Sequence, residues 1–366
     1  MMSLLPRDEA LGLVRLAVRM LVLCGLVLAI PARAAMATGT GEENPDAQKV
    51  GKSKARRPAA LPAAPAGVVI ERDVAYLPAG RKEKLDLYLP ADRPKTLRSP
   101  AVVIIHGGGW TGGDKAANRE FNIGTTLAKA GYVCASVEYL KEGAGRWPTN
   151  LHDCKNAVRF LRAHADRYQV DADHFGVIGG SAGGHLALMV AYTFGVKELT
   201  PDSPYPGNSD KVQCCVDLYG LTDLLTRQST DADGTPNGKL RDAGLFSEPH
   251  DQDPEKWKLA SPVYHISKEC PPTLILHGTA DTTVDREQSV ELDHKLTAAG
   301  VEHQLMLLPG IGHTFDLEQW QRKPLPQDLR PVVVGFFDKH LKPAANKCPS
   351  LKPDTERKQS TVAGDA

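Results

Sequence analysis

Apolar runs that alternate with helical patterns are the feature that most constrains the fold of this chain. The run at 101–105 is apolar throughout, as expected for a strand buried on both faces, and 84–89 alternates with a period of two, as a half-buried strand does. Further strands are expected at 132–137, 174–178, 212–218, 273–276 and 302–308, and helices at 118–130, 150–168, 184–191, 285–299 and 328–341. Strands that alternate with helices predict an α/β fold, a mostly parallel central sheet with helices on both faces.

The first 34 residues have the pattern of a secretory signal peptide. Arg15 and Arg19 precede an apolar run at 20–30, and a small-residue cleavage site follows at 32–34. The run is shorter than the ~20 residues that a membrane span needs, so no stable span is expected. We therefore expect cleavage after Ala34 and a secreted or periplasmic protein.

Both ends of the remaining chain have the composition of disordered segments. Residues 35–66 are rich in Ala, Pro, Lys, Gly and Glu and contain almost no large apolar side chains, which is typical of a linker. Residues 342–366 are similarly polar and form a predicted tail. The folded domain is therefore expected at 67–341, a length that can bury a large core.

Charge and cysteine usage limit the kinds of partner. The chain has 44 basic and 44 acidic residues, which gives no electrostatic attraction for nucleic acid or for an anionic membrane. Of seven cysteines, one lies in the predicted signal peptide, and the fifteen full pairings of the other six stay open. Cys134 and Cys154 lie in apolar patterns and are expected to be buried. No cysteine and histidine spacing typical of zinc occurs.

The strongest chemical signal is the sequence Gly-Gly-Ser-Ala-Gly at 179–183, which follows an apolar strand and opens a helix. This G-x-S-x-G pattern is typical of a nucleophile elbow, a sharp strand-to-helix turn that exposes a strained serine. Glycines flank the serine because only they fit so tight a bend. The alternative is a glycine-rich turn with an incidental serine, but the strand–turn–helix context favours Ser181 as a nucleophile.

A second glycine-rich sequence, His-Gly-Gly-Gly-Trp at 106–110, directly follows the buried strand. In this HGGG pattern, backbone N–H groups converge on an oxyanion. We expect Gly108, Gly109 and Ala182 to be the donors, each worth about 3 kcal/mol of transition-state stabilisation. A phosphate-binding loop is the alternative, but the G-K-[ST] ending of a P-loop is missing. His106 is expected to fix the loop, and Trp110 either lines the substrate pocket or packs beside the loop.

An acid and a histidine follow two later strands. Asp281 comes just after the strand at 273–276, and His313 stands in a glycine-rich loop after the strand at 302–308. The chain order Ser, Asp, His is that of α/β-hydrolase triads. His313 would take the proton of Ser181, and Asp281 would fix the His313 tautomer. Asp285 is the main alternative for the acid, and Asp223 a weaker one.

Together these residues resemble the esterase/lipase branch of the α/β-hydrolases, above all the group of acetylxylan esterases and feruloyl-esterase-like hydrolases, near the hormone-sensitive-lipase-type enzymes. The resemblance runs from Lys84 to the last helix and includes the motifs at 112–115, 147–148 and 261–262. It implies a serine esterase that needs no cofactor or metal and acts on a small-molecule or polysaccharide ester. An N-terminal helical cap is expected to be absent, while the stretch 221–258 either partly covers the site or forms a mobile loop. An open site suits a short acyl group such as acetyl.

Two other functions compete with this interpretation. A serine peptidase of the prolyl-oligopeptidase type shares the elbow and the residue order, but it usually carries a propeller for which this chain has no room, and it lacks the HGGG loop. A catalytically silent binding module would have lost its triad, whereas Ser181, Asp281 and His313 are all present. The natural substrate and the oligomeric state stay open, because loops rather than the fold set them.

Overall fold

An eight-stranded sheet forms the centre of the computed structural model, which describes residues 61–94, 96–141, 143, 146–240 and 244–343. The strand order is β1-β2-β4-β3-β5-β6-β9-β10. All neighbours from β4 to β10 are parallel, while β2 is antiparallel to both β1 and β4. The strands are β1 (Val68–Val74), β2 (Leu85–Pro90), β3 (Ser99–Ile105), β4 (Val133–Val137), β5 (Val170–Gly180), β6 (Cys214–Leu218), β9 (Thr273–Gly278) and β10 (His303–Leu308).

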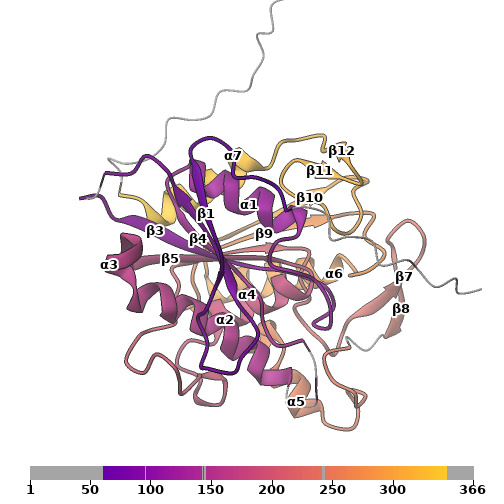
Figure 1. Ribbon diagram of the computed structural model, residues 1–366. Coiled ribbons are helices and arrows are strands. Elements are labelled where there is room, and N and C mark those ends of the chain that lie inside the picture. The colour runs from indigo at the N-terminus through magenta and orange to yellow at the C-terminus, as the bar shows by residue number, and fades with distance from the viewer. Residues whose placement is uncertain (1–60, 95, 142, 144–145, 241–243, 344–366) are drawn as a thin grey trace, which may run out of the picture. The chain divides into compact units, whose positions relative to one another are not determined.

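Helices cover both faces of this sheet (Figure 1). α1 (Asn118–Lys129) and α7 (Arg330–Leu341) pack on one face, and α2 (Arg146–Ala163), α4 (Ala182–Tyr192) and α6 (Glu287–Ala299) pack on the other. The short helices are α3 (Ala165–Tyr168), α5 (Pro254–Leu259), η1 (Lys197–Leu199) and η2 (Pro262–His265). Every residue of α4 is buried. The predicted α/β fold is therefore confirmed.

The carboxyl ends of the central strands lie at one edge of the sheet. The register pairs Gly179 of β5 with Ile105 of β3, and Gly180 with Leu218 of β6. Further along the sheet, Gly278 at the end of β9 pairs with Leu308 at the end of β10. Because parallel strands end together, the loops that follow β3, β5, β9 and β10 meet at this edge, where α/β proteins place their sites.

Several elements differ from the sequence-based prediction. The strand expected at 174–178 extends over Val170–Gly180, because its first half is partly exposed and carries polar side chains that mask the strand pattern. The helix expected at 150–168 is two helices, α2 and α3, with His164 between them. The edge strand β1 was not expected, and neither were two short hairpins, β7 (Gln228–Thr230) with β8 (Pro236–Leu240) and β11 (Gln319–Trp320) with β12 (Lys323–Pro324).

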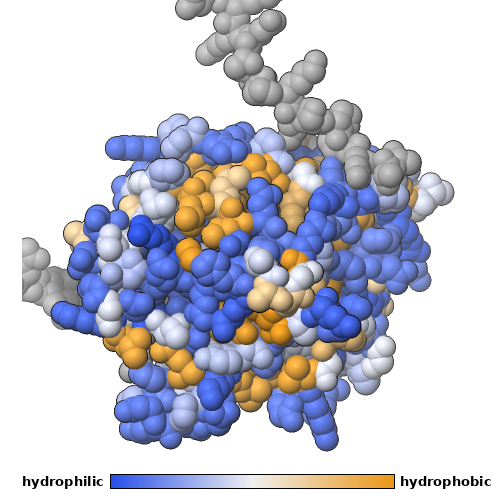
Figure 2. Space-filling model, turned by 180° about the vertical axis from the view of Figure 1, so that it is seen from behind, coloured by the Kyte–Doolittle hydropathy of each residue, from blue (hydrophilic) through white to orange (hydrophobic). Residues whose placement is uncertain are grey.

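Among the described residues, regular structure begins at Val68 and ends at Leu341. The predicted signal peptide at 1–34 and most of the predicted linker and tail lie outside the described residues. Seen from behind, the surface is mostly hydrophilic, with apolar side chains gathered in separate patches (Figure 2). No helix in the described part of the chain is both long enough and apolar enough to cross a bilayer. Cys134 and Cys154 are buried free thiols, as expected.

Candidate active site

The turn between β5 and α4 holds Ser181 in a strained conformation. Its φ of 59° and ψ of −126° are unusual for a residue other than glycine, and such a conformation costs about 1–3 kcal/mol. The surroundings enforce it, since the Ser181 N–H donates to the carbonyl of Leu218 at 2.9 Å. Gly183 permits the close approach of α4 to β3, because a Cβ there would overlap the carbonyl oxygens of Ile105 and His106. This is the geometry of a nucleophile elbow.

Ser181, His313 and Asp281 form one hydrogen-bonded line. Nε2 of His313 lies 2.9 Å from Oγ of Ser181, and Nδ1 of His313 lies 2.6 Å from Oδ2 of Asp281. The three residues follow β5, β10 and β9, so the common edge of the sheet brings them together. The arrangement allows a histidine to accept a serine proton while a carboxylate stabilises the resulting imidazolium.

Asp281 is 1% exposed and accepts hydrogen bonds on both oxygens. Oδ1 accepts the backbone N–H groups of Thr283 and Val284 at 2.8 and 2.9 Å, while Oδ2 faces His313. Nε2 of His277 is also 3.5 Å from Oδ2. Burial would raise the pKa of Asp281, but the interactions with His277 and His313 outweigh it and hold this pKa well below its ordinary value. The carboxylate is therefore ionised at neutral pH and favours a proton on Nδ1 of His313.

His313 is held through both its backbone and its ring. The indole N–H of Trp320 donates to the His313 carbonyl at 2.9 Å. The ring of Tyr219 meets the imidazole edge-on, with centroids 4.8 Å apart. These contacts hold the His313 side chain in place, and because it is 11% exposed, solvent still reaches it. Sequence reasoning missed Trp320 and Tyr219 because neither belongs to a motif.

The HGGG loop lies directly against the elbow. A Cβ on Gly107 would stand 2.6 Å from the carbonyl oxygen of Gly180. Gly108 and Gly109 have φ values of 117° and 60°, in the region that glycine adopts without strain. Ala182 is the first residue of α4, where a backbone N–H has no acceptor within the helix. The loop and the helix start that carry the three expected oxyanion donors therefore adjoin Ser181.

His106 fixes the HGGG loop from behind and is 1% exposed. Its ring stacks on Tyr139 with centroids 4.3 Å apart, and Nε2 is 3.3 Å from Oε1 of Glu138. The Tyr139 hydroxyl donates to the His106 carbonyl at 3.0 Å. Burial would raise the pKa of Glu138, but His106 and Lys141 outweigh it and lower this pKa to about 2. The loop is thus supported by the buried rings of His106 and Tyr139 and by the half-buried, ionised Glu138.

Trp110 packs within the protein and not on its surface. The side chain is 1% exposed, and its indole N–H donates to Nδ1 of His185 at 3.2 Å. Nε2 of His185 in turn donates to the carbonyl of Ala260 at 2.6 Å. Burial outweighs this last bond and lowers the pKa of His185 to about 4, so the ring is neutral. Of the two roles considered for Trp110, packing beside the loop agrees with the structure, while lining a pocket does not, because almost none of the ring is accessible.

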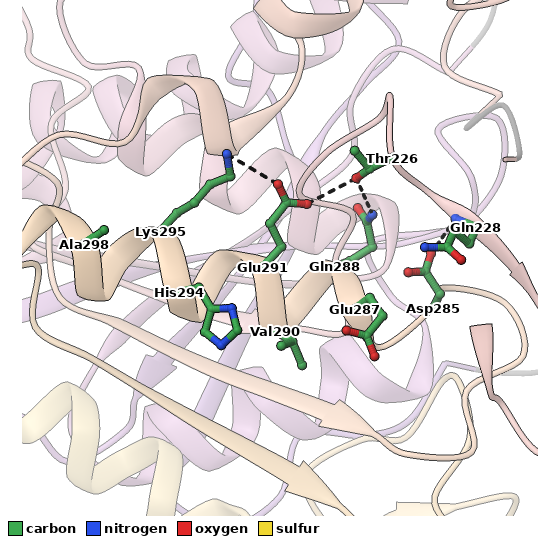
Figure 3. A pocket seen from close by; sticks show the side chains of 10 residues that line it. All are labelled: Thr226, Gln228, Asp285, Glu287, Gln288, Val290, Glu291, His294, Lys295 and Ala298. Carbon is green, nitrogen blue, oxygen red and sulfur yellow. Dashed lines mark hydrogen bonds and ion pairs between the residues drawn. The ribbon is translucent and has the colours of Figure 1, made fainter. Parts of the chain in front are cut away.

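The two alternative carboxylates make other contacts. Asp285 stands just before α6, and its Oδ2 accepts the backbone N–H of Gln228 at 2.8 Å (Figure 3). Asp223 accepts the hydroxyl of Tyr264 at 3.1 Å. Within the described part of the chain, His313 has its carboxylate partner in Asp281 alone. The geometry therefore favours Asp281 as the acid.

The first part of the stretch 221–258 is attached to the segment that carries Asp281. Gln288 of α6, shown in Figure 3, accepts the backbone N–H of Thr222 at 2.9 Å. Arg227 donates to the carbonyl of Thr283 at 2.7 Å. A Cβ on Gly234, in the turn of the β7–β8 hairpin, would stand 2.7 Å from the carbonyl carbon of Ala280. The hairpin thus lies beside the acid loop.

The sheet order and the elbow define an α/β-hydrolase, and the Ser181–His313–Asp281 line is the arrangement by which hydrolases of this class act. The sequence matches BD-FAE over residues 85–296, and the chain belongs to this family. The resemblance to the esterase/lipase branch inferred from the sequence is confirmed.

Relatives of known sequence or structure agree with this assignment. The probable carboxylic ester hydrolase LipM of Mycobacterium tuberculosis is 32% identical over 67% of this chain and 56% of LipM. Esterase LipC of the same organism is 30% identical over 64% of this chain and 57% of LipC. A truncated carbohydrate esterase from gut microbiota has a TM-score of 0.64 and 27% identity, covering 76% of this chain and 98% of that one. The chain thus spans a little over half the length of LipM and of LipC.

Proposed function

We propose that this chain is a serine carboxylic-ester hydrolase. The observation that carries the proposal is the line from Ser181 through His313 to Asp281, with distances of 2.9 and 2.6 Å. The ionised Asp281 keeps the proton of His313 on Nδ1, so Nε2 has a free lone pair facing the serine hydroxyl. The esterase names of LipM and LipC support the same reaction class.

Acylation begins when Nε2 of His313 removes the hydroxyl proton of Ser181 and Oγ bonds to the ester carbonyl carbon. The carbonyl electron pair moves onto its oxygen, where the N–H groups of the HGGG loop and of Ala182 donate to it. Each donor is worth about 3 kcal/mol at this stage. The intermediate collapses when the bond to the alcohol breaks and His313 gives its proton to the leaving oxygen. The products are a free alcohol and an acylated Ser181.

Deacylation repeats these steps with water. His313 removes a proton from a water molecule, whose oxygen attacks the acyl carbon. The second tetrahedral intermediate expels Oγ of Ser181, which regains its proton from His313. One ester and one water thus become one alcohol and one carboxylic acid.

We propose a short acyl group, acetyl above all, on a small or polysaccharide alcohol. Only strands, and no helical cap, precede the HGGG loop in the described part of the chain. Related proteins are named an ethyl acetate hydrolase from Pseudomonas putida, 28% identical over 63% of this chain and 70% of that protein, and an esterase of Thermogutta terrifontis with bound propionate, with a TM-score of 0.59 and 26% identity. The carbohydrate esterase from gut microbiota supports an ester whose alcohol is a hydroxyl group of a carbohydrate.

A peptidase is the second candidate, because dipeptidyl aminopeptidase BIII of Pseudoxanthomonas mexicana is 26% identical over 66% of this chain, although that match covers only 33% of the peptidase.

The test compares the wild type with Ser181→Ala on nitrophenyl acetate, butyrate and octanoate, on acetylated xylan and on dipeptide nitroanilides. We expect acetate to be cleaved fastest and the variant to lose about 10⁶-fold in kcat. Faster octanoate cleavage would refute the short acyl group, and faster amide cleavage would favour the peptidase.

We also propose that the protein is exported and loses its first 34 residues. Arg15, Arg19 and the apolar run at 20–30 support this proposal. Expression of the full chain in a bacterium with a secretion pathway, followed by intact-mass measurement, tests it. The expected protein begins at Ala35, and a protein that keeps Met1 in the cytoplasm would contradict export.

A further inference from the structure

A mostly buried arginine that takes no part in the steps above lies behind the site. Arg119 is in the first turn of α1, and its side chain is 14% exposed. A Cβ on Gly180 would stand 2.6 Å from its Nη1, and a Cβ on Gly107 would stand 3.3 Å from its Nη2. The guanidinium therefore fills the space behind both the elbow and the HGGG loop, and two glycines make room for it.

All three nitrogens of this guanidinium have partners. Nε and Nη2 donate to Oε1 of Glu120 at 2.8 and 2.5 Å, and Nη1 donates to the hydroxyl of Tyr219 at 2.9 Å. Burial disfavours the charged form, but Glu120 and Tyr219 outweigh it and hold the pKa of Arg119 above its ordinary value. The guanidinium group of Arg119 is thus permanently charged, and its donors point in fixed directions.

Tyr219 carries this contact to the histidine. Its hydroxyl donates to the carbonyl of Phe315 at 2.6 Å, two residues after His313. Its ring packs edge-on against both the imidazole and the ring of Phe315, with centroids 4.8 and 4.5 Å apart. Burial outweighs Arg119 and raises the pKa of Tyr219 to about 12, so the hydroxyl keeps its proton and can accept one bond while donating the other.

We propose that Arg119 and Tyr219 form one positioning unit that holds the nucleophile elbow, the oxyanion loop and the histidine loop in a single geometry. The inference rests on the proposed esterase function. These three segments follow different strands, and a misplacement of 1 Å between reacting groups can cost about 10²-fold in rate. Neither side chain belongs to the triad or to the oxyanion donors. Loss of either side chain should therefore lower kcat and leave KM nearly unchanged.

The test uses Tyr219→Phe, Arg119→Lys and the double variant of the full chain, assayed on nitrophenyl acetate well below the melting temperature. Phenylalanine keeps the ring but removes the hydroxyl, and lysine keeps the charge but removes the guanidinium group. We expect each single variant to lose about 10- to 100-fold in kcat, with an unchanged KM. Because both act through one hydrogen bond, the double variant should lose little more than the worse single variant.

Arg159→Lys is the matched control. Arg159 is also buried, donates to the carbonyl of Pro201 and lies 3.5 Å from Asp210, away from the carboxyl-end loops. This variant should lose stability and keep its kcat.

Three results would count against the inference. If the wild type hydrolyses esters no faster than Ser181→Ala, the proposed function fails and the inference falls with it. If the wild type is active and both single variants keep their kcat, the inference alone is wrong. If Arg159→Lys, at equal loss of stability, loses as much kcat as the Arg119 and Tyr219 variants, or if the losses of the two single variants simply multiply in the double variant, Arg119 and Tyr219 are not a positioning unit.

Discussion

Replacing Asp281 with asparagine exchanges one carboxylate oxygen for an amide NH₂, and the structure determines which one. Oδ1 accepts the backbone N–H groups of Thr283 and Val284 at 2.8 and 2.9 Å. An asparagine must keep its oxygen there, because an NH₂ group would face two donors, so the NH₂ turns toward Nδ1 of His313. That nitrogen must then accept, and the ring proton moves to Nε2. From there it donates to Ser181 and can no longer receive the serine proton.

We expect Asp281→Asn to lose about 10⁴-fold in kcat through this wrong tautomer, which corresponds to about 5.5 kcal/mol of transition-state stabilisation. The charge-assisted hydrogen bond to His313 also becomes a neutral one, which should cost about 1 kcal/mol in the free energy of unfolding. Steady-state hydrolysis of nitrophenyl acetate and urea unfolding measure the two effects separately.

Asp285→Asn is the matched control for this prediction. Asp285 is four residues away and also buried, but its carboxylate bonds to the backbone of Gln228 and not to His313. Its kcat should stay close to the wild-type value. An Asp281→Asn variant that keeps more than about a tenth of the wild-type kcat, or an inactive Asp285→Asn variant, would refute the assignment of the acid.

Three further predictions follow from the same geometry. In Gly108→Ala, a Cβ would overlap the carbonyl of Gly112 at a φ of 117°, so the oxyanion loop should shift and kcat fall by about 10²-fold in the nitrophenyl acetate assay. Trp110→Phe leaves Nδ1 of His185 without its donor and should lower the free energy of unfolding in urea by about 1–3 kcal/mol. Burial raises the pKa of Asp217 to about 7, so the folded protein keeps a proton that the unfolded chain releases near pH 4, and the contribution of Asp217 to stability falls as the pH rises from about 4 to about 7. Asp217→Asn should remove up to about 4 kcal/mol of this fall, measured by urea unfolding at both ends of that range.

The strands that position the site could be predicted because burial on both faces makes them continuous apolar runs. All seven residues of β3 are buried, and the loop that begins at His106 follows at once. The serine, the acid and the histidine could be found for a related reason, since each comes after a recognisable strand in the chain order of this fold. Local pattern and topology were sufficient where a functional residue stands at the end of a central strand.

The support behind these residues could not be predicted, because it depends on pairs that are distant in sequence. Arg119 and Tyr219 are 100 positions apart, and nothing in the pattern around either residue indicates the other. The two roles considered for Trp110 were separable only by its burial and its bond to His185. The edge strand β1 was missed since it carries polar residues on its exposed side, which weakens the apolar signal.

The complete burial of α4 has a consequence for laboratory evolution of this protein. All 11 residues of α4, which begins right after Ser181, are buried, so a library directed at this helix would consist largely of unfolded members. Four of the five residues of β8 are exposed, by contrast, and the hairpin turn touches the backbone just before Asp281. Diversity introduced at this hairpin should be tolerated by the fold and still reach the edge of the site. A search for variants with altered selectivity would therefore sample Pro236–Leu240 and leave the helix behind the nucleophile untouched.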